Sequence, residues 1–125
     1  MNTELYYNPD DTICAISTPP GTGGVAIARV SGKDTFTIVS RIWNGKDISR
    51  MESHTAHLGE ITDPGDSTVL DQAVLTVFRA PRSFTGEDVA EISIHGSRWI
   101  QRRLIQALTA AGARLALPGE FTRRA

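Results

Sequence analysis

The sequence has little cysteine, no excess of charge of one sign and no long apolar run. One cysteine, Cys14, excludes a disulfide within the chain and a cysteine-rich metal site, and its apolar neighbours predict a buried thiol. A net charge of −1 gives no overall attraction to nucleic acid or to an anionic membrane. No apolar run approaches the length of a membrane span and no signal peptide is recognisable, so we expect a cytoplasmic protein without membrane association.

Several catalytic motifs are also missing. The chain contains no G-x-x-x-x-G-K-[ST] segment, which excludes a P-loop nucleotide site within it. His54 and His57 offer no clear third metal ligand, and no G-x-S-x-G elbow marks a nucleophilic serine. Residues 21–26 fit the dinucleotide fingerprint G-x-G-x-x-A, but residues 25–30 have a strand pattern where that fingerprint needs a helix. We therefore expect no metal site and no catalytic residue here.

The chain does contain a regular series of strand patterns. The segments with alternating or short apolar runs are 12–17, 25–30, 57–62, 69–78, 89–95 and 114–117. The turn at Asp63–Asp66 joins the third and fourth of these into a hairpin. Helical patterns interleave with the strands, which predicts an α/β or α+β fold with a mixed β-sheet and two to three helices.

The first helix is predicted from a capping box. Ser31 has the side chain of an N-cap and Asp34 follows three residues later as its partner. Apolar residues at helical spacing then continue as far as Trp43, and Asn44-Gly45 is a typical end. We therefore expect a helix between Ser31 and Trp43.

Two further helices are predicted in the last third. Ser97 is the expected N-cap of the second, and Gly112 its end. Its buried stripe consists of Ile100, Leu104, Leu108 and Ala111. A third helix begins at Glu120, close to the last residue, so we expect residues 120–125 to start a helical segment of a longer protein.

Arg29 and Glu91 are charged residues in strands that are otherwise apolar on one face. If both strands belong to one sheet, the two side chains line one cleft. A carboxylate accepts two parallel hydrogen bonds, which suits a fused heterocycle with an amino group beside a ring N–H. Arginine suits a carbonyl oxygen or a carboxylate. The alternative is a plain salt bridge between them, and the sequence leaves both possibilities open.

The last third is also basic. Six arginines follow residue 97, against one acid, Glu120. Such a cluster suits an acidic partner or RNA, and the alternative is a solvated helix face.

Five segments carry a resemblance to a known family: Asp11-Thr12-Ile13, Pro20 to Gly32, Ser83 to Glu91, His95-Gly96 and Pro118 to Ala125. In this order and spacing they resemble the N-terminal domain of the MnmE (TrmE) family of tRNA-modification GTPases. The match spans about residues 11–125. Ser97 departs from the pattern, because many members have a second glycine after the His-Gly pair.

The resemblance implies a folate-binding and dimerisation domain over residues 11–119, preceded by a loose arm over residues 1–10. The fold would be similar to the folate-binding domain of glycine-cleavage aminomethyltransferases. The implied ligand is 5-formyl- or 5,10-methylenetetrahydrofolate and the implied assembly a homodimer. Arg29 and Glu91 match folate-contacting positions of the family. A folate-contacting lysine of the family falls just past Ala125, so we expect an incomplete site.

The resemblance further implies a full-length enzyme that uses GTP, Mg and K through a GTPase domain. With the flavoprotein MnmG it would install a carboxymethylaminomethyl-type group at C5 of the wobble uridine of certain tRNAs. We expect no enzymatic activity from this chain alone. The alternative is a self-standing RNA- or protein-binding module that uses the C-terminal arginines. A P-loop motif further along the gene would favour the GTPase.

Overall fold

The computed structural model describes residues 8–19, 21 and 23–125. Its elements are β1 (Ile13–Ile16), β2 (Val25–Ser31), α1 (Thr35–Ser40), β3 (Trp43–Asn44), the 3-10 helix η2 (Ile48–Arg50), β4 (Thr55–Thr62), β5 (Val69–Phe78), β6 (Val89–His95), α2 (Arg98–Ala110), β7 (Arg114–Leu115) and α3 (Glu120–Arg124). Most of the expected N-terminal arm, together with Pro20 and Thr22, lies outside the described residues.

The strands form one mixed sheet in the order β3-β4-β5-β6-β2-β1-β7. All neighbouring strands are antiparallel except β1 and β7, which are parallel. The mixed α/β architecture predicted from the sequence is confirmed, including the β4–β5 hairpin. No helix in the described part of the chain is long and apolar enough to span a membrane.

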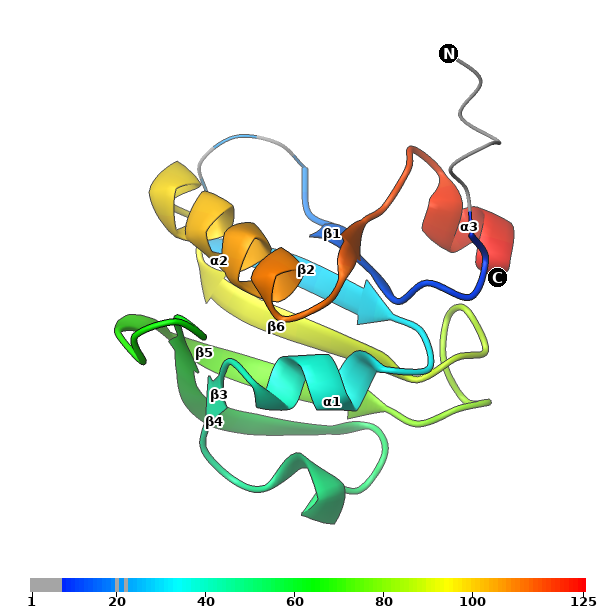
Figure 1. The fold of residues 1–125 in the computed structure, drawn as a ribbon, viewed down its shortest axis with the longest axis horizontal. Helices are drawn as coiled ribbons and strands as arrows, with labels where there is room; N and C mark the ends of the chain where they lie inside the picture. The colour runs from blue at the N-terminus through cyan, green and yellow to red at the C-terminus, as the bar shows by residue number, and fades with distance from the viewer. Residues whose placement is uncertain (1–7, 20, 22) are drawn as a thin grey trace.

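Helices α1 and α2 both cover one face of the sheet (Figure 1). The core lies between them and the strands, because alternate strand residues such as Ala28, Val30 and Ile92 point toward this side and are fully buried. Leu104 and Leu108 of α2 pack against the same cluster. The opposite side, here called the outer face, carries the side chains of Arg29 and Glu91.

The second predicted helix is confirmed as α2. The Ser97 hydroxyl accepts a hydrogen bond from the backbone N–H of Ile100 at 3.3 Å, as an N-cap does. Gly112 ends the helix with a φ of +123°, a conformation that favours glycine.

The prediction for the first helix is wrong at both ends. Ser31 does not cap it, because β2 continues to pair with β6 through Ser31 and the helix begins only after Asp34. Ser31 instead makes buried side-chain hydrogen bonds. The helix ends at Ser40, and Trp43 belongs to β3, where it pairs with Ile61. Sheet pairing thus overrides the local helical pattern at both boundaries.

Candidate ligand-binding site

The two predicted site residues, Arg29 and Glu91, lie directly opposite each other on β2 and β6. The Nε and Nη2 atoms of Arg29 both donate to Oε2 of Glu91, at 3.1 and 2.9 Å. Each side chain is about a quarter exposed, at 24% and 26%. The salt bridge is therefore the observed arrangement. Among the described residues, Oε1 of Glu91 has no hydrogen-bond partner.

Arg29 also borders an open pocket of about 410 Å³. Its Cζ atom lies 5.0 Å from the centre of the Phe84 ring and 5.6 Å from that of Phe121. At these distances a cation is attracted to an aromatic ring. The other residues that line the pocket are Ala15, Ile16, Ser17, Ala116, Leu117, Pro118, Gly119 and Thr122. Mostly apolar walls with one guanidinium group suit a flat ring system that carries polar oxygens.

Glu91 is not among the described residues that line this pocket. Arg29 lies between it and the pocket, because β2 separates β6 from β1 in the sheet. The structure therefore brings the two predicted residues together as a pair, but only the arginine faces the pocket.

The C-terminal wall of the pocket is held by a buried ionic network centred on Glu120. This fully buried carboxylate accepts hydrogen bonds from both Nη atoms of Arg114 at 3.0 and 2.7 Å, from Nη2 of Arg124 at 3.0 Å and from the Leu117 N–H at 2.9 Å. Burial opposes ionisation, but the hydrogen bonds from Arg114 and Leu117 and the charges of Arg114 and Arg124 together outweigh it and lower the pKa of Glu120. The hydrogen bond to Glu120 correspondingly raises the pKa of Arg114.

Arg124 joins this wall to the loop before β6, which carries Phe84. Its Nη1 atom lies 3.3 Å from both carboxylate oxygens of Glu87. Glu87 in turn accepts a hydrogen bond from the Ser31 hydroxyl at 2.8 Å. The two segments that place aromatic rings beside Arg29 are thus connected through one polar network.

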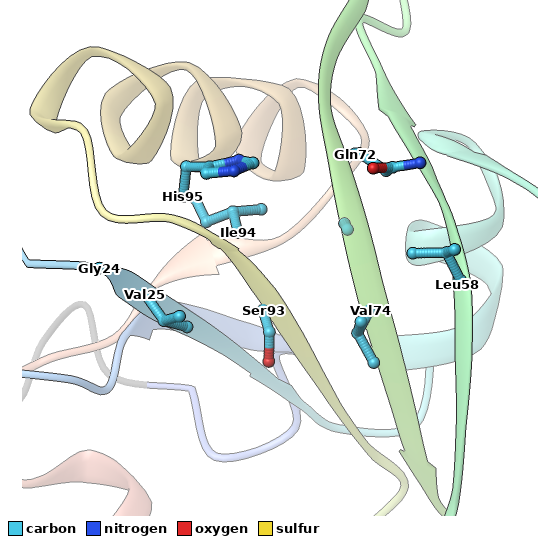
Figure 2. A pocket seen from close by; sticks show the side chains of 9 residues that line it. Gly24, Val25, Leu58, Gln72, Val74, Ser93, Ile94 and His95 are labelled. Atoms are coloured by element: carbon cyan, nitrogen blue, oxygen red, sulfur yellow. The ribbon is translucent and has the colours of Figure 1, made fainter.

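A second pocket, of about 270 Å³, lies on the outer face (Figure 2). Figure 2 shows Val25, Leu58, Val74 and Ser93, from four neighbouring strands, around it. Val25 and Leu58 are 62% and 67% exposed. At its rim, Nδ1 of His95 lies 2.9 Å from Oδ1 of Asp71. This hollow is mainly apolar and wide open.

Sequence reasoning identified Arg29 and Glu91 but missed Phe84, Phe121 and Glu120. The two phenylalanines lie in a turn and in a five-residue helix, where no periodicity marks them. Glu120 had a usable signal, because it is the one acid among the six arginines of the last third. In the part of the chain that the structure describes, no group of three side chains is arranged to hold a metal ion.

Comparison with known proteins places these features in a family. Residues 12–125 match the family model described as GTP-binding protein TrmE N-terminus. The relative from Lactiplantibacillus plantarum, named tRNA modification GTPase MnmE, is 50% identical over 115 residues, which cover 92% of this chain and 25% of that protein. Proteins of the same name from Thermus thermophilus and Parabacteroides distasonis are 50% and 51% identical over 118 residues.

Those two alignments cover 94% and 91% of this chain and 27% and 25% of the relatives. The chain thus spans about a quarter of the length of the curated relatives it matches. The matched range includes the whole sheet, the Arg29–Glu91 pair and the Glu120 network. The chain therefore belongs to the family of TrmE N-terminal domains, found in tRNA modification GTPases.

Proposed function

We propose that this domain binds a tetrahydrofolate, as 5-formyl- or 5,10-methylenetetrahydrofolate, at the Arg29–Glu91 pair and the adjoining pocket. The observation that carries the proposal is the guanidinium of Arg29 at the pocket, close to the rings of Phe84 and Phe121. A tetrahydrofolate combines a pterin, whose pyrimidine ring is flat, with N–H donors and carbonyl oxygens. Aromatic walls, an arginine and a nearby carboxylate match those groups. Similarity to the aminomethyltransferase folate domain is part of the proposal.

The two charged residues have different roles in this proposal. Arg29 contacts the polar oxygens of the folate, and Glu91 accepts hydrogen bonds from the amino-pyrimidine edge of the pterin. Because Oε2 of Glu91 already accepts two bonds from Arg29, Oε1 is the acceptor available to the ligand. A contact through both oxygens requires Arg29 to release at least one of its bonds.

For the longer protein, we propose GTP hydrolysis coupled to tRNA modification, in keeping with the names of the relatives. The flavoprotein MnmG is the proposed partner, and the product a carboxymethylaminomethyl-type group at C5 of the wobble uridine, formed in the cytoplasm. GTP, Mg and K would be bound by regions of the relatives that this chain does not cover. This chain supplies folate binding and homodimer contacts and does not itself hydrolyse GTP.

A self-standing RNA- or protein-binding module is the weaker alternative. The relatives match this chain as one quarter of a longer GTPase rather than as a separate protein. That relationship supports a part of a larger enzyme rather than a self-standing module.

Three substitutions test the site. Glu91→Gln keeps the shape but replaces an acceptor by a donor, which costs roughly 2–4 kcal/mol of binding free energy. We expect 5-formyltetrahydrofolate to bind about 30- to 1000-fold more weakly. Arg29→Lys keeps the charge but loses the planar, paired N–H donors of the guanidinium, and it should weaken binding less than Glu91→Gln. His95→Ala should have the smallest effect, because four residues of strand, roughly 13 Å, separate it from Glu91.

The measurement is isothermal calorimetry on a version of the protein extended past residue 125, so that the expected lysine is present. Circular dichroism of each variant serves as the folding control. Unchanged folate affinity in Glu91→Gln would contradict the proposed contact and leave Glu91 with a purely structural salt bridge.

A further inference from the structure

Helix α2 presents a face whose aromatic residue is exposed and most of whose charges have no partner among the described residues. Arg98 and Arg102 lie one turn apart, and neither makes a hydrogen bond or ion pair with another described residue. Trp99, next to Arg98, is 60% exposed. Arg103 lies over the Trp99 ring, with 5.8 Å from Cζ to the ring centre, and pairs with Asp63. These four residues, 98, 99, 102 and 103, are here called the basic face of α2.

A pocket of about 370 Å³ adjoins the basic face. It is lined by Ile16, Thr18, Gly21, Arg98, Gln101 and Arg102. The Gln101 side chain donates to the carbonyl oxygens of Gly21 and Gly96, at 3.2 and 3.0 Å, and so links Gly21 to the helix. No acid is among the described residues that line this pocket. Two guanidinium groups therefore meet at a hollow to which the described residues supply no counter-ion.

The exposed indole indicates which kind of anion fits. A solvated helix face accounts for the arginines, but it does not account for a tryptophan that is more than half exposed. The carboxylates of an acidic protein would pair with the arginines, but carboxylates do not stack on an indole ring. RNA uses both features, because its phosphates pair with arginine and its unpaired bases stack on aromatic rings.

We propose that the basic face of α2 binds looped or single-stranded RNA, with Arg98 and Arg102 on phosphates and Trp99 stacked on an unpaired base. This site goes beyond the folate proposal and does not depend on it, because different side chains carry it. The two are nonetheless adjacent, since Ile16 lines both the Arg29 pocket and the pocket at Arg102. An RNA held here lies beside the place proposed for the one-carbon donor.

Fluorescence anisotropy with a labelled RNA hairpin tests the proposal on this chain, using the same stem as a blunt duplex for comparison. The double variant R98E/R102E should weaken hairpin binding at least about tenfold. The slope of the logarithm of the binding constant against the logarithm of salt concentration should fall by the amount expected for loss of roughly two phosphate contacts. Trp99→Ala should weaken hairpin binding about 5- to 150-fold, the range for loss of one stacked base, and duplex binding much less.

The matched control is K46E/R50E, which makes the same charge change on the segment before β4, and it should leave binding within about threefold of wild type. In a Trp43→Phe background, where Trp99 is the one remaining tryptophan, the hairpin should quench fluorescence. Thermal unfolding followed by circular dichroism shows that each variant is folded.

Three results would overturn the proposal. The first is no hairpin binding by the wild-type chain. The second is an equal loss in K46E/R50E, which would mean attraction through net charge alone. The third is binding of a polyglutamate peptide, but not RNA, that depends on Arg98 and Arg102, which would assign the face to an acidic protein. Folate affinity is measured separately, so either proposal can fail while the other holds.

Discussion

At the scale of single residues, Cys14 shows how burial alone changes side-chain chemistry. It lies in β1 opposite Val30 and is fully buried, as its apolar neighbours in the sequence predicted. Burial raises the pKa of its thiol from 9.0 to about 11, because the thiolate loses its hydration. The side chain is therefore an uncharged, unreactive part of the core at neutral pH.

This shift predicts a pH dependence of stability. As pH rises above 9.0 the unfolded thiol ionises, whereas the folded thiol stays protonated up to about 11. The unfolded state therefore binds fewer protons in this range, and the free energy of unfolding falls with rising pH, by up to about 3 kcal/mol. Below pH 9.0 the contribution of Cys14 to the free energy of unfolding is constant. Urea unfolding of wild type and Cys14→Ala across this range isolates it, and parallel pH profiles would contradict the prediction.

At the scale of elements, α3 depends on side chains rather than on its own helical stability. Five residues are too few for an isolated helix in water. Glu120, its first residue, holds it in place through Arg114 and Arg124. Glu120→Gln should therefore lower the free energy of unfolding by about 3 kcal/mol, because two guanidinium groups each lose one of their two carboxylate partners at a buried position.

The sign of the pH dependence follows from the lowered pKa of Glu120. A carboxylate whose pKa is lowered by folding stabilises the fold at pH values above its ordinary pKa of 4.5. That contribution is lost as the pH falls through the pKa of the folded state. Glu120→Gln should thus flatten the acid limb of the stability profile. Asp63→Asn is the control, since it breaks a partly exposed pair with Arg103 and should cost less than about 1 kcal/mol. Equal losses for the two variants would refute the role assigned to Glu120.

The glycine-rich loop before β2 supplies another element-scale prediction. A Cβ on Gly96 would overlap the carbonyl of Gly23, whereas a Cβ on Gly24 would meet no atom within 4 Å. Gly96→Ala should therefore cost about 1–3 kcal/mol of stability, and Gly24→Ala much less. Thermal unfolding of both variants measures the difference. Comparable melting temperatures would show that the loop moves aside without penalty.

The elements differ in how well their sequences predict them. Residues 89–95 and the helix from Arg98 were predicted because one apolar face repeats with a clear period and Ser97 and Gly112 mark the helix ends. The segment from Ser31 to Trp43 was mispredicted because pairing with distant strands, β6 and β4, decides it. The contacts of Glu120 are local in sequence, but Arg124 extends its network to Glu87, 37 residues away, and no local pattern records that link.

The parts of the candidate site also differ in how well the sequence predicts them. Arg29 and Glu91 were predicted because charged residues in apolar strands are conspicuous, and the pairing of β2 with β6 then places them opposite each other. A cleft lined by both residues was predicted, but only Arg29 lines the pocket, and most of its walls come from the loop before β6 and the C-terminal segment, which were not predicted. Their position depends on buried ion pairs rather than on periodicity.

At the scale of the whole molecule, the sheet is unequally covered. Helices α1 and α2 pack on one face (Figure 1), while the outer face carries the exposed side chains of Val25 and Leu58 around an open apolar hollow (Figure 2). Contiguous apolar patches on a soluble protein commonly mark an interaction surface. This face therefore supports the proposed homodimer.

We expect light scattering to give the mass of a dimer for this chain, with dissociation on dilution. Leu58→Asp should shift the equilibrium to monomer, raising the dissociation constant at least about 100-fold, because a charge would be buried without a partner in an apolar interface. The control is Leu115→Asp, which places the same charge on a similarly exposed leucine of β7 and should leave the dimer intact. Both variants should keep the wild-type circular dichroism spectrum. A wild-type chain that stays monomeric at high concentration would argue against the dimer, and a shift caused equally by Leu115→Asp would locate the interface at the β7 edge instead.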